Sequence, residues 1–255
     1  MNTKIFYFTS TGNSLYVAKK IKAGLLGGDI ISMSKALKTG DFHGEAEVII
    51  LVYPIHCFSL PIAAEKFISK LNISKDAYIA AVGVSGGGGA KDSFTHINQL
   101  LKGKGEISNY ECIKYISNYT RMGRTPTQER ALKAIDENEE LLNKFIESIK
   151  KREVKKVSSN RGTVARIFYN TWKNTYKNKD KAFNVNEQCI GCEMCKKICP
   201  VDDIEMVEGK PKWLGKCTDC MACINICPKE AINIGKGTLK KNRYRNPYIN
   251  VQELL

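Results

Sequence analysis

Short apolar runs alternate with stretches of helical periodicity over the first 150 residues of the chain. Five runs are rich in β-forming side chains and predict strands at residues 4–8, 29–33, 48–53, 78–84 and 111–116. The third and fourth runs are continuously apolar, as expected for strands buried on both faces of a sheet. Helical spacing predicts helices at about residues 15–25, 61–71, 90–101 and 126–149. The alternation predicts βαβ units around a mostly parallel sheet.

The last of these helices is expected to begin at a capping box, with a proline in the first helical position. The box comprises Thr125, Pro126, Thr127 and Gln128. One face of the helix would then carry the apolar residues Leu132, Ile135, Leu142, Phe145 and Ile149.

A basic segment follows the predicted sheet. Residues 150–181 contain eleven Lys or Arg and two acidic residues, which is nine of the fourteen net positive charges of the chain. Within it, four apolar residues recur at every fourth position: Val164, Phe168, Trp172 and Tyr176. This spacing predicts a basic amphipathic helix that docks against one domain and links it to the next. A membrane-surface or acidic-partner role is the alternative, and nucleic acid is not expected, since no recognition motif accompanies the charge.

Eight of the ten cysteines form two identical runs, each reading C-x2-C-x2-C-x3-C-P. The first comprises Cys189, Cys192, Cys195 and Cys199, and the second, 28 residues further on, Cys217, Cys220, Cys223 and Cys227. This spacing holds [4Fe-4S] clusters, and in a doubled motif the fourth thiolate of each cluster comes from the other run. The expected ligand sets are therefore Cys189, Cys192, Cys195 and Cys227 for one cluster, and Cys217, Cys220, Cys223 and Cys199 for the other. Residues 184–235 resemble the two-cluster bacterial ferredoxins.

Structural zinc and disulfides are the alternatives for these cysteines. Neither run contains a histidine, and no signal peptide precedes the first predicted strand, so both alternatives are less favoured. No stretch approaches the 18 or so apolar residues of a membrane span, and a cytoplasmic protein is expected. The formal charge of +14 leaves the coordinated thiolates uncounted. Two clusters with their ligands would add about −4.

The first predicted strand is followed at once by a polar loop: Thr9, Ser10, Thr11, Gly12, Asn13 and Ser14. Hydroxyls and backbone N–H groups at a helix N-terminus can bind a phosphate, and glycine lets the backbone turn and approach closely. Asn13 is expected to bond its own backbone and hold the loop. An ordinary capped strand-to-helix turn is the alternative. The six residues resemble the flavodoxin phosphate loop, T-x-T-G-N-S/T. That resemblance implies FMN and a flavodoxin-like, doubly wound five-stranded sheet of order 2-1-3-4-5.

Two further loops fall where the flavin ring of such a protein would lie. One follows the third strand and supplies Tyr53, Pro54, Ile55 and His56; the other follows the fourth and supplies Ser85, Gly86, Gly87 and Gly88. The second loop has no aromatic residue, which departs from the flavodoxin pattern and suggests an open ring face or simply a mobile loop. His56 is a candidate catalytic proton donor and Cys57 a candidate reactive thiol, with plain packing as the alternative for both. In the loop after the fifth strand, Tyr119 could touch the ring, and Arg121 or Arg124 could meet an anion.

The combined pattern resembles the fused flavodoxin–ferredoxin proteins of anaerobic bacteria. The expected divisions are an FMN-binding domain (1–150), a basic helical linker (151–182), an α+β bacterial ferredoxin-like domain with two [4Fe-4S] clusters (183–236) and a basic tail over the surface (237–255). The resemblance implies electron transfer between the clusters and FMN, with a redox protein as partner. The alternative is an FMN-dependent reductase of a quinone, nitro compound or enone. The flavin and clusters could meet within one chain or across a homodimer.

Overall fold

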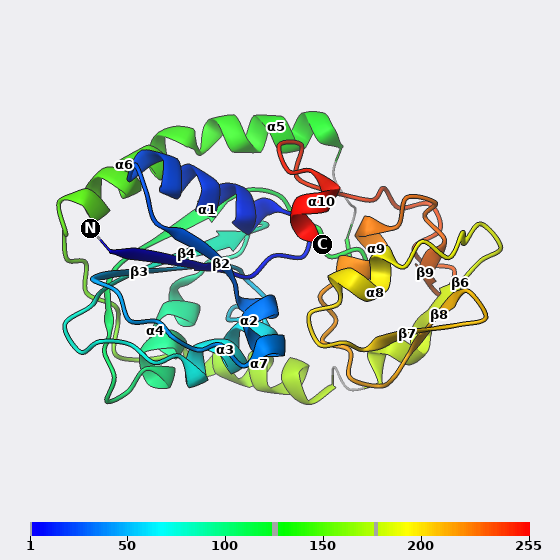
Figure 1. Cartoon of the computed structure of the whole chain (residues 1–255), viewed down its shortest axis with the longest axis horizontal. Helices are drawn as coiled ribbons and strands as arrows, with labels where there is room; N and C mark the ends of the chain where they lie inside the picture. Colours follow the sequence, from blue (N-terminus) through cyan, green and yellow to red (C-terminus); the bar gives the residue numbers. More distant parts are fainter. Residues whose placement is uncertain (1, 124–126, 176–177) are drawn as a thin grey trace.

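Five parallel strands form the central sheet. The computed structural model describes residues 2–123, 127–175 and 178–255. The sheet has the order β2-β1-β3-β4-β5, which confirms the predicted order, and all neighbours run parallel (Figure 1). Its strands are β1 (Thr3–Tyr7), β2 (Asp29–Ser32), β3 (Val48–Pro54), β4 (Tyr78–Ser85) and β5 (Ile107–Lys114). The edge strand β5 begins four residues before its predicted start, because it is only half-buried and polar side chains interrupt its apolar pattern.

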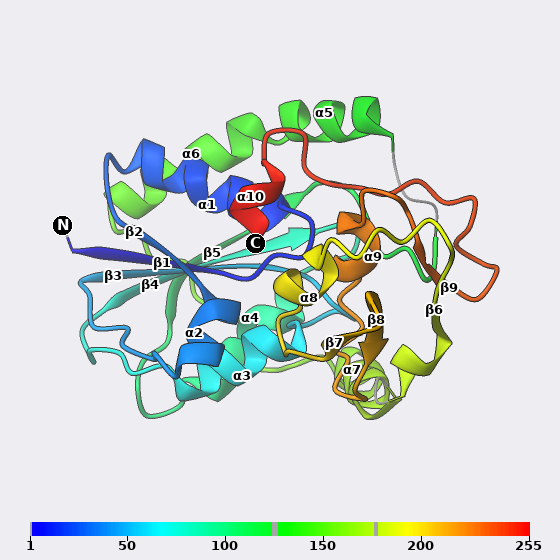
Figure 2. The same ribbon diagram turned by 45° about the vertical axis from the view of Figure 1, so that its right-hand side comes forward.

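Helices cover both faces of this sheet. One face carries α1 (Asn13–Gly24), α5 (Gln128–Glu137) and α6 (Glu139–Lys150), and the other carries α2 (Met33–Thr39), α3 (Ile62–Lys70) and α4 (Lys91–Leu100) (Figures 1 and 2). Strand side chains alternate between the two layers, so that Ile5 and Ile50 pack with α1 and α6, while Phe6 and Leu51 pack with α2 to α4. Two separate apolar layers therefore hold the sheet rigid, with its carboxyl ends free to form a site.

Two helical predictions need correction. The predicted helix at 126–149 is broken at Asn138, whose side chain bonds both the N–H (3.2 Å) and the carbonyl (2.8 Å) of Lys114 and so ties the break to the end of β5. Thr125 and Pro126 of the predicted capping box lie outside the described residues; α5 is capped by Thr127, whose hydroxyl accepts from the Arg130 N–H at 3.4 Å. The other correction is α2, a helix that the apolar pattern did not predict and that Ser32 caps.

The linker helix α7 (Thr163–Thr175) docks on the α3 and α4 side of the sheet (Figure 1). The residue that docks it is Tyr169, which is 1% exposed and donates to Glu65 at 2.7 Å. The predicted apolar stripe lies elsewhere: Val164 and Phe168 are 68% and 56% exposed, and Tyr176 lies outside the described residues. The stripe prediction was wrong for Val164 and Phe168, whereas Trp172 packs against His56 and Tyr169. The helix is turned because the Tyr169 hydroxyl meets the Glu65 carboxylate in the interface.

The cysteine-rich segment lies beyond the carboxyl ends of the strands (Figures 1 and 2). It contains two short antiparallel pairs, β6 (Phe183–Val185) with β9 (Ile232–Ile234) and β7 (Ile204–Val207) with β8 (Lys210–Trp213). The 3-10 turn η1 (Lys179–Ala182) precedes them, and two five-residue helices, α8 (Met194–Ile198) and α9 (Ala222–Ile226), pack against each other. Each helix follows a residue of positive φ and ends before a Cys-Pro pair, as a 28-residue repeat predicts.

The C-terminal tail does more than lie over the surface. Tyr244, Asn246 and Ile249 are 2%, 0% and 3% exposed, and α10 (Val251–Leu254) lies beside the start of α1 (Figure 2). The tail therefore runs back from the cysteine-rich segment to the sheet domain. The basic composition of the tail predicted a solvated segment, but the side chains of Tyr244, Asn246 and Ile249 are buried.

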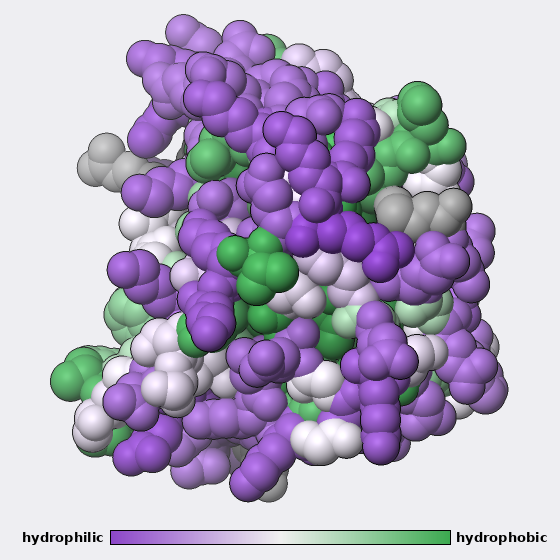
Figure 3. All heavy atoms as spheres, turned by 90° about the vertical axis from the view of Figure 1, so that its left-hand side faces the viewer, coloured by the Kyte–Doolittle hydropathy of each residue, from purple (hydrophilic) through white to green (hydrophobic). Residues whose placement is uncertain are grey.

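The opposite end of the molecule, where the chain begins, is mostly hydrophilic with separate apolar groups (Figure 3). Across the described parts of the chain, no helix is both long and apolar enough to cross a bilayer.

Candidate functional site

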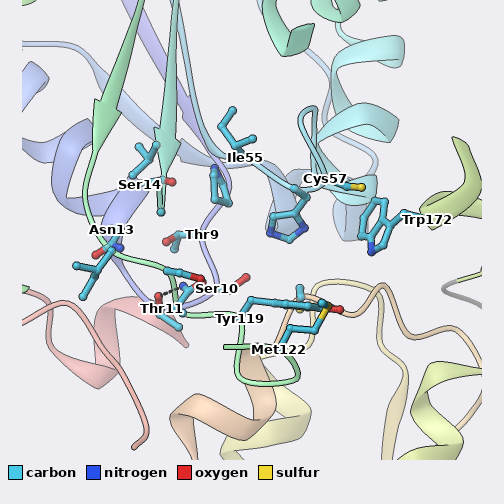
Figure 4. Close-up of a pocket in the computed structure, with 18 of the residues that line it drawn as sticks. Thr9, Ser10, Thr11, Asn13, Ser14, Ile55, Cys57, Tyr119, Met122 and Trp172 are labelled. Carbon is cyan, nitrogen blue, oxygen red and sulfur yellow. Dashed lines mark hydrogen bonds between the residues drawn. The ribbon is translucent and has the colours of Figure 1, made fainter. Parts of the chain in front are cut away.

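A cavity of about 340 Å³ lies at the carboxyl ends of the strands (Figure 4). The winding of the sheet reverses between β1 and β3, and ligands bind at such a point in sheets of this kind. Residues that follow β1, β3, β4 and β5 all contribute to the wall of the cavity. Nine of the fourteen residues predicted to bind the cofactor line it: Thr9, Ser10, Thr11, Asn13, Ser14, Pro54, Ile55, His56 and Gly86. Cys57, the candidate reactive thiol, and Tyr119, a predicted ring contact, line it as well. Residues not predicted for the flavin site also line it, among them Val84, Ile116, Asn118, Met122, Trp172, Lys179 and Cys220.

The phosphate-loop candidates form one end of the cavity. Gly12 has φ +101°, a conformation that side-chain-bearing residues rarely adopt, and its N–H donates to the Thr9 hydroxyl at 3.0 Å. Ser10 and Ser14 are 4% and 1% exposed, and their hydroxyl oxygens have no hydrogen-bond partner among the described residues. Buried hydroxyls without partners are costly unless a ligand satisfies them. Beside the N-terminus of α1, these hydroxyls fit a phosphate.

The role predicted for Asn13 needs correction. Its side chain does not bond its own loop; its Oδ1 accepts from Tyr244 and Asn246 of the C-terminal tail. A second long-range bond joins the Thr11 hydroxyl to the side-chain amide of Asn118, in the loop after β5.

The opposite end of the cavity is lined by the turn after β3 and by α7. Cys57 and Phe58 both have positive φ (46° and 67°), in a tight turn closed by backbone bonds between His56 and Ser59. Left-handed backbone at such residues costs of order 1 kcal/mol each and persists where the surrounding structure holds it. The His56 and Trp172 rings meet edge to face with centroids 5.9 Å apart. Burial lowers the pKa of His56 to about 4, so its imidazole is neutral near pH 7.

Five of the residues predicted to bind the cofactor do not line the cavity. Gly12 of the phosphate loop packs against Asn246 and Ile249 of the C-terminal tail instead. Tyr53 is 0% exposed and its hydroxyl pairs with that of Ser93 at 2.9 Å, so it belongs to the core. Ser85 closes its own loop by bonding the Gly88 carbonyl and the Gly87 N–H. Gly87 and Gly88 face open space. Gly86 alone of this loop is close-packed, since a Cβ there would lie 2.6 Å from Ser117 Cα.

The glycine-rich loop after β4 has no aromatic residue, and the aromatic side chains that line the cavity come from other segments. Trp172 of α7 and Tyr119 of the loop after β5 both line the cavity (Figure 4). Tyr119 was a predicted contact. Trp172 was predicted only as a docking residue, because nothing local in the sequence places the linker helix beside the third strand.

Two smaller cavities are enclosed by the cysteines. One is lined by Cys189, Cys192, Cys195 and Cys227, and the other by Cys199, Cys217, Cys220 and Cys223. The structure thus brings together each predicted set of four, including the cysteine from the opposite run. Within the described ranges, no three His, Cys, Asp or Glu side chains form a site for a single metal ion. A cubane cluster instead takes one thiolate at each iron corner, and the two sets of four cysteines fit that chemistry. The set with Cys189 is called the first shell and the set with Cys217 the second shell.

Backbone N–H groups point at the sulfurs of both shells. Asp203 donates to Cys199, Asp219 to Cys217 and Ala231 to Cys227, each at 3.3 Å. Such bonds stabilise negative charge on sulfur and influence cluster potentials.

One cysteine, Cys220, lines two cavities. Cys220 lines the cavity of the second shell and also the large cavity at the strand ends, next to the phosphate loop. The adjacent Asp219, with a side chain 0% exposed, pairs with Arg121 at 2.7 Å and Lys179 at 3.3 Å and accepts a hydrogen bond from Tyr119. The loop after β5 is thereby clamped onto the second cysteine run.

Comparison with known proteins assigns the cysteine-rich segment. Residues 181–228 match the family model of the 4Fe-4S dicluster domain. The chain joins a flavodoxin-like domain to a 4Fe-4S dicluster domain. No curated protein sequence matches the chain.

Solved structures similar to the flavodoxin-like domain include several flavodoxins. One from Streptococcus pneumoniae TIGR4 is 16% identical, covers 60% of this chain and 99% of its own, and has a TM-score of 0.39. A short-chain flavodoxin associated with a PDU bacterial microcompartment is 17% identical (59% and 98%, TM-score 0.42). A Fusobacterium nucleatum flavodoxin bound to flavin mononucleotide is 18% identical (60% and 98%, TM-score 0.38). The fold assignment itself rests on the strand order.

The two cysteine shells of the dicluster domain differ in exposure. Cys192 of the first shell is exposed and its neighbour Ile190 is 61% exposed. The second shell faces the flavodoxin-like domain through Cys220. The dicluster domain therefore has one shell toward solvent and one toward the large cavity.

Proposed function

We propose that this protein transfers electrons between two [4Fe-4S] clusters in the dicluster domain and an FMN in the cavity of the flavodoxin-like domain. The observation that carries the proposal is the position of Cys220, which lines both the second cysteine shell and that cavity. A ligand of the second cluster would then lie in the wall of the flavin site, within one chain. FMN links one-electron carriers to two-electron chemistry.

The residues of the chain have distinct tasks in this proposal. Ser10 and Ser14 offer unpaired hydroxyls to the phosphate, and Ile55, Tyr119 and Trp172 enclose the ring end. The four cysteines of each shell hold one cluster, as expected from their spacing. Asp219, with its cationic partners, fixes the boundary between the domains.

An external redox protein would exchange electrons at the first shell. Cys192 is exposed there, and Ile190 and Val207 (61% and 43% exposed) supply apolar contact area. The proposed route runs from the partner to the first cluster, to the second cluster and then to FMN, or in reverse.

Composition and kinetics test this function together. Anaerobically purified protein should contain about eight irons and one FMN per chain. After rapid mixing with a one-electron donor, bleaching of the flavin should follow bleaching of the clusters. In Cys217→Ser, which lacks a ligand of the second cluster, flavin reduction should slow at least tenfold while bound FMN stays stoichiometric. Flavin reduction at the wild-type rate in that variant would contradict the route.

A small-molecule reductase is the second candidate. His56 lines the cavity away from the phosphate loop, where a substrate over the ring could meet a neutral imidazole. A steady-state assay with a reduced donor and quinones, nitro compounds or enones separates the two. If the wild-type protein turns over an acceptor and His56→Ala does not, with iron and FMN retained, the reductase is favoured. If the wild-type protein turns over none of these acceptors, the electron carrier is favoured.

A further inference from the structure

The C-terminal tail completes the loop that is expected to bind phosphate. Asn246 is fully buried and its backbone N–H donates to the carbonyl of Thr11 at 2.8 Å. A Cβ on Gly12 would lie 3.0 Å from Asn246 Cβ and 3.1 Å from Ile249 Cβ. The tail therefore packs against the backbone of the loop itself, more than 200 residues away in sequence.

The side chain of Asn13 shows what this packing does. Its Oδ1 accepts two hydrogen bonds, from the Tyr244 hydroxyl at 2.7 Å and from Asn246 Nδ2 at 3.0 Å. An amide oxygen has two lone pairs, so both acceptor positions are filled by the tail. The amide NH2 of Asn13 is then turned away from the tail, and Asn13 lines the cavity beside Ser14 (Figure 4).

We propose that Tyr244 and Asn246 are positioning residues for the flavin phosphate: they hold the Asn13 amide so that its NH2 group donates into the phosphate site. This inference rests on the proposed function, because it requires FMN in the cavity. Asn13 would join the unpaired hydroxyls of Ser10 and Ser14 in one donor set. Residues 1–150 alone would then lack part of their cofactor site.

The same tail is anchored in the dicluster domain. The backbone N–H of Tyr244 donates to Asn225 Oδ1 at 3.0 Å, and Asn225 lies in α9 between Cys223 and Cys227. Asn225 also donates to the Thr120 hydroxyl at 3.1 Å and to the Asn118 carbonyl at 3.3 Å. A continuous set of hydrogen bonds thus joins the helix of the second cysteine run to the phosphate loop.

Comparing FMN with riboflavin tests the proposal, because riboflavin has the same ring and no phosphate. The full chain, with clusters loaded and flavin removed, is titrated anaerobically with each flavin by calorimetry. Tyr244→Phe removes only the hydroxyl, and loss of that one hydrogen bond should raise the Kd for FMN about five- to tenfold. Asn246→Ala should raise it at least as much. The Kd for riboflavin should stay within about twofold of wild type for both. Tyr248→Phe is the matched control, since Tyr248 is 53% exposed in the same tail.

Two results would overturn the positioning role. One is an unchanged Kd for FMN in both tail variants. The other is an equal loss of FMN and riboflavin affinity, which would mean that the tail only stabilises the fold. If the wild-type chain itself binds FMN no more tightly than riboflavin, the phosphate site fails and the positioning role fails with it. If it binds neither flavin, the proposed flavin function fails.

Discussion

The guanidinium of Arg121 donates two hydrogen bonds to Oδ1 of Asp219, at 2.9 Å from Nε and 2.7 Å from Nη2. Arg121 belongs to the loop after β5 and Asp219 to the second cysteine run, so this pair holds the two domains together. The Asp219 carboxylate is fully buried, and only its partners compensate its charge.

Removing Arg121 should therefore weaken the domain boundary. Arg121→Ala leaves Asp219 with Lys179 and Tyr119 only, and a broken buried pair costs about 3 kcal/mol. We expect a lower midpoint of thermal unfolding and loss of cluster absorbance at lower temperature, both recorded anaerobically at one scan rate. Arg130→Ala, on the exposed side of α5, is the control. Identical midpoints for the two variants would show that the pair contributes nothing.

Gly12→Val should empty the flavin site and spare the clusters. Valine is strained at φ +101°, and its Cβ would crowd Asn246 and Ile249. The FMN-to-iron ratio of purified protein should fall at least tenfold, while the iron–sulfur absorbance persists. Gly89→Val is the comparison, because a Cβ at Gly89 meets nothing within 4 Å. Stoichiometric FMN in Gly12→Val would refute the phosphate-loop assignment.

Exchanging one cysteine in each run tests the crossed ligand sets. Cys199→Ser should disturb the cluster of the second run, because Cys199 lines a cavity with Cys217, Cys220 and Cys223. Iron should fall from about eight to about four per chain, and the remaining cluster should be the one of the first run. Cys227→Ser should do the reverse, and only Cys199→Ser should remove the cluster next to the flavin cavity. Paramagnetic resonance spectra of the two single variants should therefore be complementary; loss of the same cluster in both would exclude the crossing.

Mild acid should destabilise the protein through two histidines. Burial lowers the pKa of His56 to about 4, and burial with the nearby Arg161 cation does the same for His96. An unfolded histidine titrates near pH 6.5, so between about pH 6.5 and 4 the unfolded state binds protons that the folded state does not. Stability contributed by each neutral ring is complete above pH 6.5 and falls as pH drops toward 4, by up to about 3 kcal/mol per histidine.

The pH dependence can be measured by denaturant unfolding from pH 7 to pH 4.5. His96→Gln should flatten the slope, because Gln has no ionisable ring to keep neutral beside Ser59. A slope as steep as that of wild type in His96→Gln and in His56→Gln would mean that neither histidine is responsible.

Much of the architecture could be read from local patterns. The apolar runs predicted all five strands and the resemblance to flavodoxins their order, and the spacing of the cysteines predicted the sets that the structure brings together. The phosphate-loop residues Thr9, Ser10 and Ser14 line the cavity, and their binding of a phosphate stays a prediction. These features are local or repeated, so neighbouring residues suffice to indicate them.

The sequence predicted less well where individual side chains lie in the folded protein. Tyr53 was expected at the flavin and lies in the core, while Trp172 was expected only to dock a helix and lines the cavity. Both outcomes depend on which helix covers which strand end. The tail looked like a solvated basic segment, yet Tyr244 and Asn246 are among its buried residues.

The sequence by itself determined which chemistry the chain can hold, because spacing along a turn decides whether thiolates or hydroxyls can converge. Only the tertiary structure decided that Cys220 faces the phosphate loop and that Asn13 is held by a tail 231 residues away. Such contacts join segments whose separation in sequence carries no information about their distance in space. They form when both domains pack across the carboxyl edge of the sheet, where the burial of Asp219 and Tyr244 selects one arrangement.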